Sequence, residues 1–312
     1  MKTRCASPVA VALARRELDE LAARLGTEVP REARPGADLA TRARRADPWP
    51  VPAPLLRAAD GWVHPGPPTA WSAFVDMVTA LGASWPDLGE LTVDEIDREA
   101  AAWMLPAAAV RATPAVADLV PDVAAASGVA ASVVGATVVV FGTAWATPLV
   151  GRMLAELGAR VVKVEHPYRP DPFPLHDDLV RGQEVLGLDL GAPGDRDAVA
   201  ALVEHADLVV EGHPPRVLAN AGIQPPGAVL RIGAFVAGDR PGYGPAAEAH
   251  GGWAARHDPP RLARTSLADP VAGLAGAVTA VDLLTRAVPR AHARISLEGA
   301  VGRLLEREQR GG

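Results

Sequence analysis

The hydrophobic pattern is clearest in residues 137–165, which read TVVVFGTAWATPLVGRMLAELGARVVKVE. Thr137–Phe141 is an unbroken β-branched and apolar run, which is typical of a strand buried on both faces. After a turn at Gly142–Trp145, large apolar residues recur at four-residue steps over 149–157 and predict a helix, and Val161–Val164 predicts a second buried strand. The stretch is therefore a βαβ unit with a right-handed crossover. A ligand would bind where the first strand meets the helix.

The same alternation of strands and helices continues toward the C-terminus. Apolar runs predict further strands at Leu186–Leu190, Leu208–Val210, Val229–Phe235 and Ala293–Leu297, and helices at Asp195–His205, Arg216–Asn220 and Asp269–Leu284 and after Leu297. Glycines, prolines and charged residues fill 238–262, so an irregular connection is expected there. Strands that alternate with helices indicate a parallel, doubly wound sheet. The predicted fold class is α/β, with a Rossmann-like, mostly parallel sheet and helices on both faces.

Helical patterns dominate the N-terminal part of the chain. Helices are expected after the Ser7-Pro8 pair, after Thr69 and after Thr92, where TVDE has the form of a capping box. Gly61–His64 is a candidate short strand, and the tryptophans at 62, 71, 85 and 103 are expected to form the core of this region. The predicted organisation is a small α-rich domain over 1–135, ending in a linker, and a Rossmann-like domain over 136–312.

Composition and charge exclude several classes of function. The chain has 312 residues, of which 49% are hydrophobic, and a net charge of −6, which argues against nucleic acid or an anionic membrane as the main partner. Cys5 is the single cysteine, so the chain forms no internal disulfide and a reducing, cytoplasmic location is expected. No run of about 18 apolar residues is evident, so no membrane span is expected. The eight histidines show no metal-binding spacing, and no metal is expected.

The turn of the βαβ unit lacks the glycine pattern of a dinucleotide site. It reads Gly142-Thr143-Ala144-Trp145-Ala146-Thr147, one glycine followed by bulky residues. A G-x-G-x-x-G pattern would be needed for the backbone to approach a pyrophosphate closely. A nicotinamide dehydrogenase is therefore only a distant alternative.

Asp269 is the one carboxylate with an unusual setting. It precedes Pro270 at the start of the nearly all-apolar stretch Val271–Leu284. The first interpretation is an N-cap, in which aspartate accepts backbone N–H bonds and proline occupies the first turn, worth roughly 1 kcal/mol. The second is a rigidly held nucleophile in apolar surroundings, able to attack an activated carbonyl. The residues alone leave both open.

Four stretches resemble motifs of one enzyme family, in the order in which they occur along the chain. They are Trp145–Glu165, similar to "AGP…LLADLGAEVIKVE"; Leu179–Leu190 with Ala206–Glu211 and Pro215–Gly222, similar to "LNRGKRSVALDL…ADVVVENFRPGVLERLG"; Leu267–Leu274, similar to the segment with the catalytic aspartate; and Ile295–Glu298, similar to "VDVSLLE". The family is the family III CoA-transferases (CaiB/BaiF type), which includes formyl-CoA and carnitine CoA-transferases and α-methylacyl-CoA racemase. The resemblance covers roughly residues 137–305.

The resemblance implies an activity and an assembly. Residues 50–120 are similar to the family's small domain, which in the family follows the catalytic stretch, so the chain resembles a shortened and permuted member. By resemblance, Asp269 is the nucleophile, the substrates are an acyl-CoA and a carboxylic acid, coenzyme A is the moiety transferred, and two chains form a homodimer. Trp145 and Tyr243 are expected to shape the pocket, His166 and Arg216 to face CoA phosphates, and Thr147 stands where the family has a glycine.

The chain also departs from the family pattern. Gln183 replaces a lysine, Gly212 an asparagine and Asn220 an arginine, which weakens the expected grip on CoA phosphates. The general-base histidine of the racemase has no counterpart, since the matching position is near Gly242–Tyr243 and His250 lies too far along the chain. A CoA-transferase is therefore the predicted function. A non-catalytic CoA-binding or partner subunit is the alternative, and an acyl-CoA racemase is a weaker one.

Overall fold

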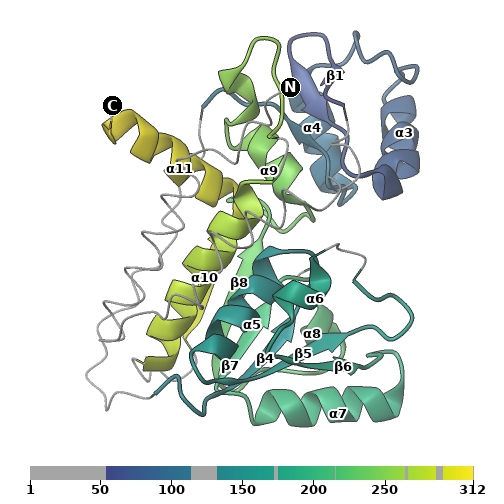
Figure 1. The fold of residues 1–312 in the computed structure, drawn as a ribbon. Coiled ribbons are helices and arrows are strands. Elements are labelled where there is room, and N and C mark those ends of the chain that lie inside the picture. The colour runs from purple at the N-terminus through teal and green to yellow at the C-terminus, as the bar shows by residue number, and fades with distance from the viewer. Residues whose placement is uncertain are drawn as a thin grey trace.

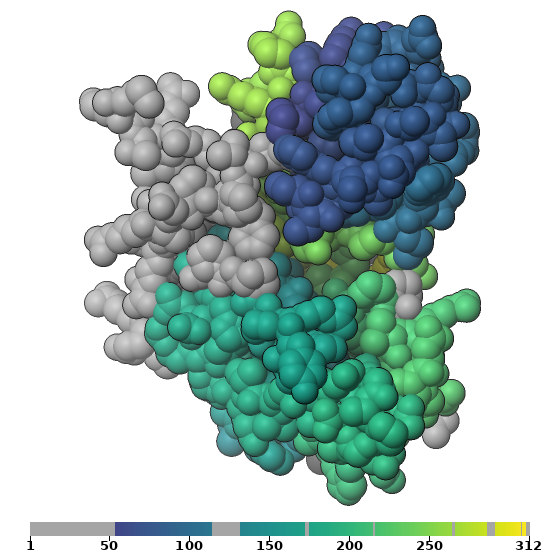
Figure 2. Space-filling model, turned by 90° about the vertical axis from the view of Figure 1, so that its right-hand side faces the viewer, coloured from purple at the N-terminus to yellow at the C-terminus, as the bar shows by residue number. Residues whose placement is uncertain are grey.

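The computed structural model describes residues 54–113, 132–171, 175–214, 216–263, 266–285 and 291–311. The helix expected after Ser7 and most of the expected linker lie outside these ranges. The described chain forms a Rossmann-like domain and a small lobe built from residues 54–113 (Figure 1). Figure 2 shows the small lobe as a separate body stacked on the Rossmann-like domain.

A six-stranded parallel sheet is the centre of the larger domain. Its strands are β4 (Thr137–Phe141), β5 (Arg160–Glu165), β6 (Glu184–Gly187), β7 (Leu208–Glu211), β8 (Ala228–Gly233) and β9 (His292–Ser296). They lie in the order β6-β5-β4-β7-β8-β9, and every neighbouring pair is parallel. Val138, Val139 and Val140 of β4 are fully buried, as the unbroken apolar run predicts. The predicted α/β fold class is confirmed.

Helices cover both faces of this sheet. On one face lie α5 (Ala146–Glu156) and α10 (Ala268–Thr285), which run side by side (Figure 1). On the other lie α7 (Pro193–Glu204) and the short α8 (Val217–Asn220), whose apolar residues join a separate core cluster with Val139 and Val209.

Helix α10 corrects one expectation from the sequence. Among the described residues, α10 is the one helix that is both long enough and apolar enough to cross a membrane, whereas no such run is expected from the sequence pattern. However, 89% of that 18-residue window is buried inside the protein. Burial on all sides, between α5, the sheet and α11, explains why its sequence is apolar throughout.

The small lobe combines two helices with a small antiparallel sheet. It contains β1 (Leu56–Arg57), β2 (Trp62–His64), the 3₁₀ turn η2 (Pro68–Ala70), α3 (Trp71–Ala80), α4 (Val93–Ala102) and β3 (Ala108–Ala109). The capping box predicted at Thr92 and Glu95 is present, whereas Thr69 lies inside η2 and does not cap α3.

The expectation that tryptophans form the core of the small lobe is wrong. Trp85 and Trp103 are 36% and 46% exposed, and the other two are only partly buried. The core consists instead of aliphatic residues with Phe74 and Met77. The tryptophans lie at its margin, where Trp71 Nε1 can still donate a hydrogen bond to the Gly66 carbonyl, 3.0 Å away.

Residues 238–262 are more regular than expected and join the two lobes. They contain α9 (Gly244–His250) and the 3₁₀ turn η3 (Ala254–Arg256). Helix α9 packs against β2 and β3 of the small lobe and against α11 (Leu297–Gly311), and the Arg111 N–H donates to the Ala249 carbonyl over 3.0 Å. Two other boundaries differ from prediction: β6 lies at 184–187, earlier than expected, and the four-residue α6 (His176–Leu179) precedes it.

Candidate active site

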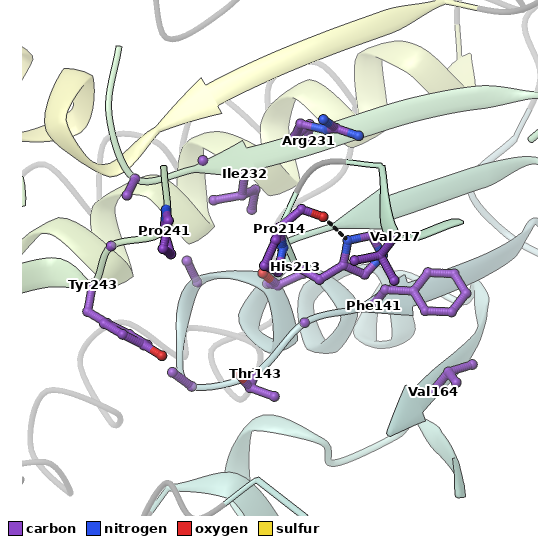
Figure 3. A pocket seen from close by; sticks show the side chains of 18 of the residues that line it. Phe141, Thr143, Val164, His213, Pro214, Val217, Arg231, Ile232, Pro241 and Tyr243 are labelled. Atoms are coloured by element: carbon purple, nitrogen blue, oxygen red, sulfur yellow. Dashed lines mark hydrogen bonds between the residues drawn. The ribbon is translucent and has the colours of Figure 1, made fainter. Parts of the chain in front are cut away.

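A large cavity lies at the carboxyl edge of the sheet. It has a volume of about 760 Å³ and is lined by residues that follow all six strands, among them Gly142, His166, Asp189, His213 and Ala234. The strand order reverses between β4 and β7, and ligands of open α/β sheets bind at this switch point. Figure 3 shows Tyr243 on one side of the cavity and His213 with Val217 on the other.

Asp269 lines this cavity from the start of α10. Helix α10 begins at Ala268, so Asp269 is its second residue and not its N-cap. The Ser266 hydroxyl donates a hydrogen bond to Asp269 Oδ2 over 2.5 Å, and the Gly244 N–H donates to the same carboxylate. Burial raises the pKa of Asp269, although these hydrogen bonds oppose the shift. A largely desolvated carboxylate with a raised pKa is more basic, and hence more nucleophilic, than a solvated one.

The structure brings some of the predicted site residues together and separates others. Thr147, His166 and Tyr243 line the same cavity as Asp269. Trp145 is buried at the N-terminus of α5 and does not line it. Arg216 lines a second, smaller cavity beside β8 and β9. The pKa of Tyr243 is raised by burial and by the charges of Asp171 and Asp269, so its phenol is protonated at neutral pH.

Thr147 fills the space between the ends of β4 and β7. Its side chain is 3% exposed and packs between Gly142 and Gly212, at the ends of β4 and β7. A Cβ atom on Gly212 would lie 2.1 Å from Thr147 Oγ1, so only glycine fits opposite this threonine. The two departures from the family pattern at these positions are therefore compensating changes in size.

The turn between β4 and α5 is held in a strained conformation. Ala144 has φ 65°, a value that non-glycine residues seldom adopt. Its N–H donates to Asp171 Oδ2 over 2.7 Å, which ties the turn to the loop after β5. Strain of this kind is concentrated at functional sites, where surrounding contacts over-determine the backbone.

His213 is a cavity residue that the sequence did not single out. Its Nδ1 lies 3.1 Å from the Pro214 carbonyl oxygen, which assigns the proton to Nδ1 (Figure 3). Burial lowers the pKa of His213, so the imidazole is neutral. Nε2 is then a buried acceptor that meets no hydrogen-bond partner among the described residues. It is available to a donor group of a ligand.

Most arginines of the cavity wall are already engaged. Arg231 pairs with Glu211 and Arg294 contacts Asp239, at 2.5 and 3.7 Å. Arg169, on the exposed loop after β5, has no ion-pair partner among the described residues. No cluster of three or more potential metal ligands occurs in the described ranges.

A charged network joins the small lobe to the cavity wall. Asp97 of α4 accepts hydrogen bonds from Arg240, a cavity residue, over 2.9 Å and from His250 of α9 over 3.3 Å. His250 also bonds Glu298 of α11 over 2.5 Å. We call these four residues the lobe clasp. Burial alone would lower the pKa of His250, but its hydrogen bonds to Asp97 and Glu298 raise it to about 9.

Comparison with known proteins places this site in a family. A model described as CoA-transferase family III matches residues 133–288, half of the chain. The chain belongs to CoA-transferase family III. The match covers β4 to the end of α10, including Asp269 and the cavity loops.

Several proteins show partial similarity to this family member. A succinyl-CoA–D-citramalate CoA-transferase from Chloroflexus aurantiacus is 30% identical over 134 residues, or 34% of this chain and 33% of that protein. A succinyl-CoA:mesaconate CoA-transferase from Haloarcula hispanica is 41% identical over 81 residues, covering 21% and 20%. The CoA-transferase/lyase DddD from a Marinomonas species is 36% identical over 91 residues, covering 29% and 11%. The chain thus spans a third or less of these relatives.

Solved structures show the same fold. A hypothetical protein from Mycobacterium tuberculosis superimposes with a TM-score of 0.52 at 22% identity, covering 59% of each chain. A CaiB/BaiF family protein from Brucella suis gives a TM-score of 0.50 at 22% identity, covering 58% of this chain and 57% of that one.

One further departure from the family motif has a structural explanation. Gln183, which replaces a lysine, does not line the cavity. Its Nε2 donates to the Pro148 carbonyl over 2.9 Å and to the Leu179 carbonyl over 2.8 Å, which fastens α6 against α5. The lost positive charge is replaced by a packing contact, so this position offers no cation to a phosphate.

Proposed function

We propose that this family III member transfers CoA between an acyl-CoA thioester and an acceptor carboxylate, with Asp269 as the nucleophile. The observation that carries the proposal is a buried aspartate of raised pKa on the wall of the cavity at the sheet's switch point. The names of the partial relatives support the same class of reaction.

The proposed chemistry proceeds by covalent relay. An Asp269 oxygen attacks the thioester carbonyl, the C–S bond breaks, and CoA leaves as a thiolate, which gives an acyl–aspartyl anhydride. The thiolate then attacks the aspartyl carbonyl, releasing the donor carboxylate and leaving an aspartyl-CoA thioester. An acceptor carboxylate repeats these steps in reverse order and departs as the new acyl-CoA. A buried site suits this route because water would hydrolyse the anhydride.

Transfer fits the site better than racemisation. The position that the resemblance gives to the racemase base falls near Gly242–Tyr243, where Tyr243 is the only titratable side chain. Its phenol has a raised pKa and cannot remove a proton from carbon at neutral pH. A non-catalytic CoA-binding or partner subunit is the second candidate, favoured by the ion pairs that already engage Arg231, Arg240 and Arg294.

Ligand choice provides a direct test. We expect the chain to bind CoA in preference to NAD, because the chain belongs to a CoA-transferase family and its β4–α5 turn lacks the G-x-G-x-x-G spacing of a nicotinamide dinucleotide site. Arg169→Ala should weaken CoA binding roughly fivefold and reduce its salt dependence. Isothermal titration calorimetry at two ionic strengths measures both effects.

The matched control is Arg98→Ala, which removes an exposed arginine of α4 that does not line the cavity. This variant should bind CoA as the wild type does. Tighter binding of NAD than of CoA would overturn the proposal. CoA binding without any transfer across a panel of acyl-CoAs would leave the partner-subunit alternative.

The family resemblance also leads us to propose a homodimer. Light scattering at micromolar concentration is expected to give twice the mass of one chain. A strict monomer over this range would remove the dimer from the proposal without affecting the fold or the site.

A further inference from the structure

A second buried carboxylate lies directly behind Asp269. Glu248 is on α9, fully buried, and does not line the cavity. Its Oε1 accepts the Leu267 N–H over 2.7 Å and its Oε2 accepts the Ala263 N–H over 3.1 Å. The Ser266 hydroxyl bonds Asp269 and also reaches the Glu248 carboxyl. The three side chains form a continuous line from α9 to the cavity.

The start of α9 is built to approach this line closely. A Cβ atom on Gly244 would lie 2.0 Å from Asp269 Oδ2 and 1.8 Å from Ser266 Oγ, so only glycine is tolerated. The bare backbone lets the Gly244 N–H donate to the Asp269 carboxylate. Helix α9 therefore supplies both a donor to Asp269 and, one turn later, Glu248.

The number of hydrogen-bond donors in this cluster indicates which carboxyl group carries a proton. Ser266 carries one hydroxyl proton and faces two carboxyl groups, so it can donate to only one of them at a time. It donates to Asp269, which leaves its oxygen free to accept from a protonated Glu248. Burial, together with the charge of Asp269, raises the pKa of Glu248 to about 8, so this carboxyl is neutral at pH 7.

We propose that Glu248 is a positioning residue for Asp269: as a neutral acid it hydrogen-bonds to Ser266, directs the Ser266 hydroxyl to Asp269, and leaves Asp269 as the single ionised carboxylate of the cluster. An ionised Glu248 would compete for the Ser266 proton and would disfavour the ionised form of Asp269. The other titratable groups near the cluster are Tyr243, which interacts with Asp269, and Asp171, which interacts with Tyr243. His250, at the other end of α9, is paired with Asp97 and Glu298.

Infrared spectroscopy of the full chain tests this assignment without requiring catalysis. The wild type should show a buried carboxylic-acid C=O band at neutral pH that disappears as pH rises through about 8. Glu248→Gln should remove the band. Asp269→Asn should move its titration to lower pH, because the neighbouring negative charge is gone. Ser266→Ala should also move it to lower pH, because the protonated Glu248 carboxyl loses the acceptor to which it donates.

The control is Asp282→Asn, a buried aspartate on the same helix as Asp269 that does not line the cavity; it should leave the band unchanged. The assignment is overturned if no carboxylic-acid band at neutral pH depends on Glu248, or if its titration ignores both Asp269→Asn and Ser266→Ala. The last two variants retain Glu248, so the test stands even if Glu248→Gln fails to fold.

The kinetic part of the inference rests on the proposed transferase activity. The transfer rate should fall above about pH 8 in the wild type, and Glu248→Gln should lose this alkaline limb with KM for acyl-CoA unchanged. A band that titrates as expected in a chain without transfer would uphold the positioning geometry and remove the proposed function. If the chain transfers CoA and the alkaline limb persists in Glu248→Gln, the proposed function stands and the positioning role of Glu248 is removed.

Discussion

Asp269→Asn is expected to abolish CoA transfer while leaving the fold intact. An amide oxygen is a poor nucleophile, so activity should fall by roughly four orders of magnitude or more. The asparagine side chain has nearly the same volume as aspartate, and its amide oxygen can still accept the hydrogen bonds from Ser266 and Gly244. Intact-mass measurement after incubation with an acyl-CoA and hydroxylamine should show an aspartyl hydroxamate in the wild type and none in the variant.

The free energy of unfolding of Asp269→Asn should be equal to that of the wild type or slightly higher. The pKa of Asp269 is raised in the folded chain, so the folded state holds this proton more tightly than the unfolded chain does. The ionised carboxylate therefore lowers the free energy of unfolding as pH rises above its ordinary pKa of 3.8. A neutral amide removes this cost. Thermal unfolding at neutral pH should occur at the same or a slightly higher temperature.

Asp282→Asn is the matched control, since it makes the same substitution at a buried aspartate on the same helix that does not line the cavity. It should transfer CoA at the wild-type rate and form the same adduct. Wild-type transfer by Asp269→Asn would show that Asp269 is not the nucleophile. If the wild type transfers no CoA with a broad panel of acyl-CoAs, the result would favour the partner-subunit alternative.

Local patterns were sufficient to predict the centre of the fold. The run Thr137–Phe141 gave β4, and the apolar residues at four-residue steps gave α5, because elements buried against a sheet carry a strong periodic signal. β6 was placed two residues late because it is an edge strand with mostly exposed side chains, so burial leaves little mark on its sequence.

Helix α9 and Glu248 were missed for one physical reason. The segment GPAAEAH is buried on nearly all sides, so it has no polar face and no amphipathic period. It is helical because it packs between the small lobe and α11, contacts that are distant in sequence. A lone glutamate among alanines and glycines is typical of a solvated loop, and only the packing shows that its neighbours are Ser266 and Asp269.

Removing Asp97 is expected to loosen the attachment of the small lobe. The Arg240 side chain is 7% exposed and that of Asp97 is 16% exposed, so Asp97→Asn leaves a buried guanidinium without its counter-ion. Breaking a buried ion pair in this way costs about 3 kcal/mol or more in the free energy of unfolding. Urea unfolding followed by tryptophan fluorescence is informative here, because four tryptophans lie in the small lobe.

The clasp should also make stability depend on pH in a defined direction. Since the pKa of His250 is raised from 6.5 to about 9, its contribution is complete below pH 6.5 and is lost as pH rises through about 9. For Asp97, burial would raise the pKa, but His250 and Arg240 outweigh it and hold the pKa far below 3.8, so this contribution is present above pH 3.8 and is lost in acid. Stability should therefore decline between pH 6.5 and about 9 in the wild type, and less so in Asp97→Asn, where His250 keeps only Glu298.

Asp94→Asn is the control for the clasp. Asp94 is on the same helix and bonds Arg111, but its side chain is 73% exposed, so its ion pair should contribute below about 1 kcal/mol. If Asp97→Asn were as stable as Asp94→Asn at pH 6.5, the clasp would hold nothing together. If it is less stable by the expected margin, then Arg240 and the cavity wall depend on the small lobe. In that case the contact between Asp97 of α4 and Arg240 holds the small lobe against the cavity wall, although the lobe precedes the Rossmann-like domain in the sequence.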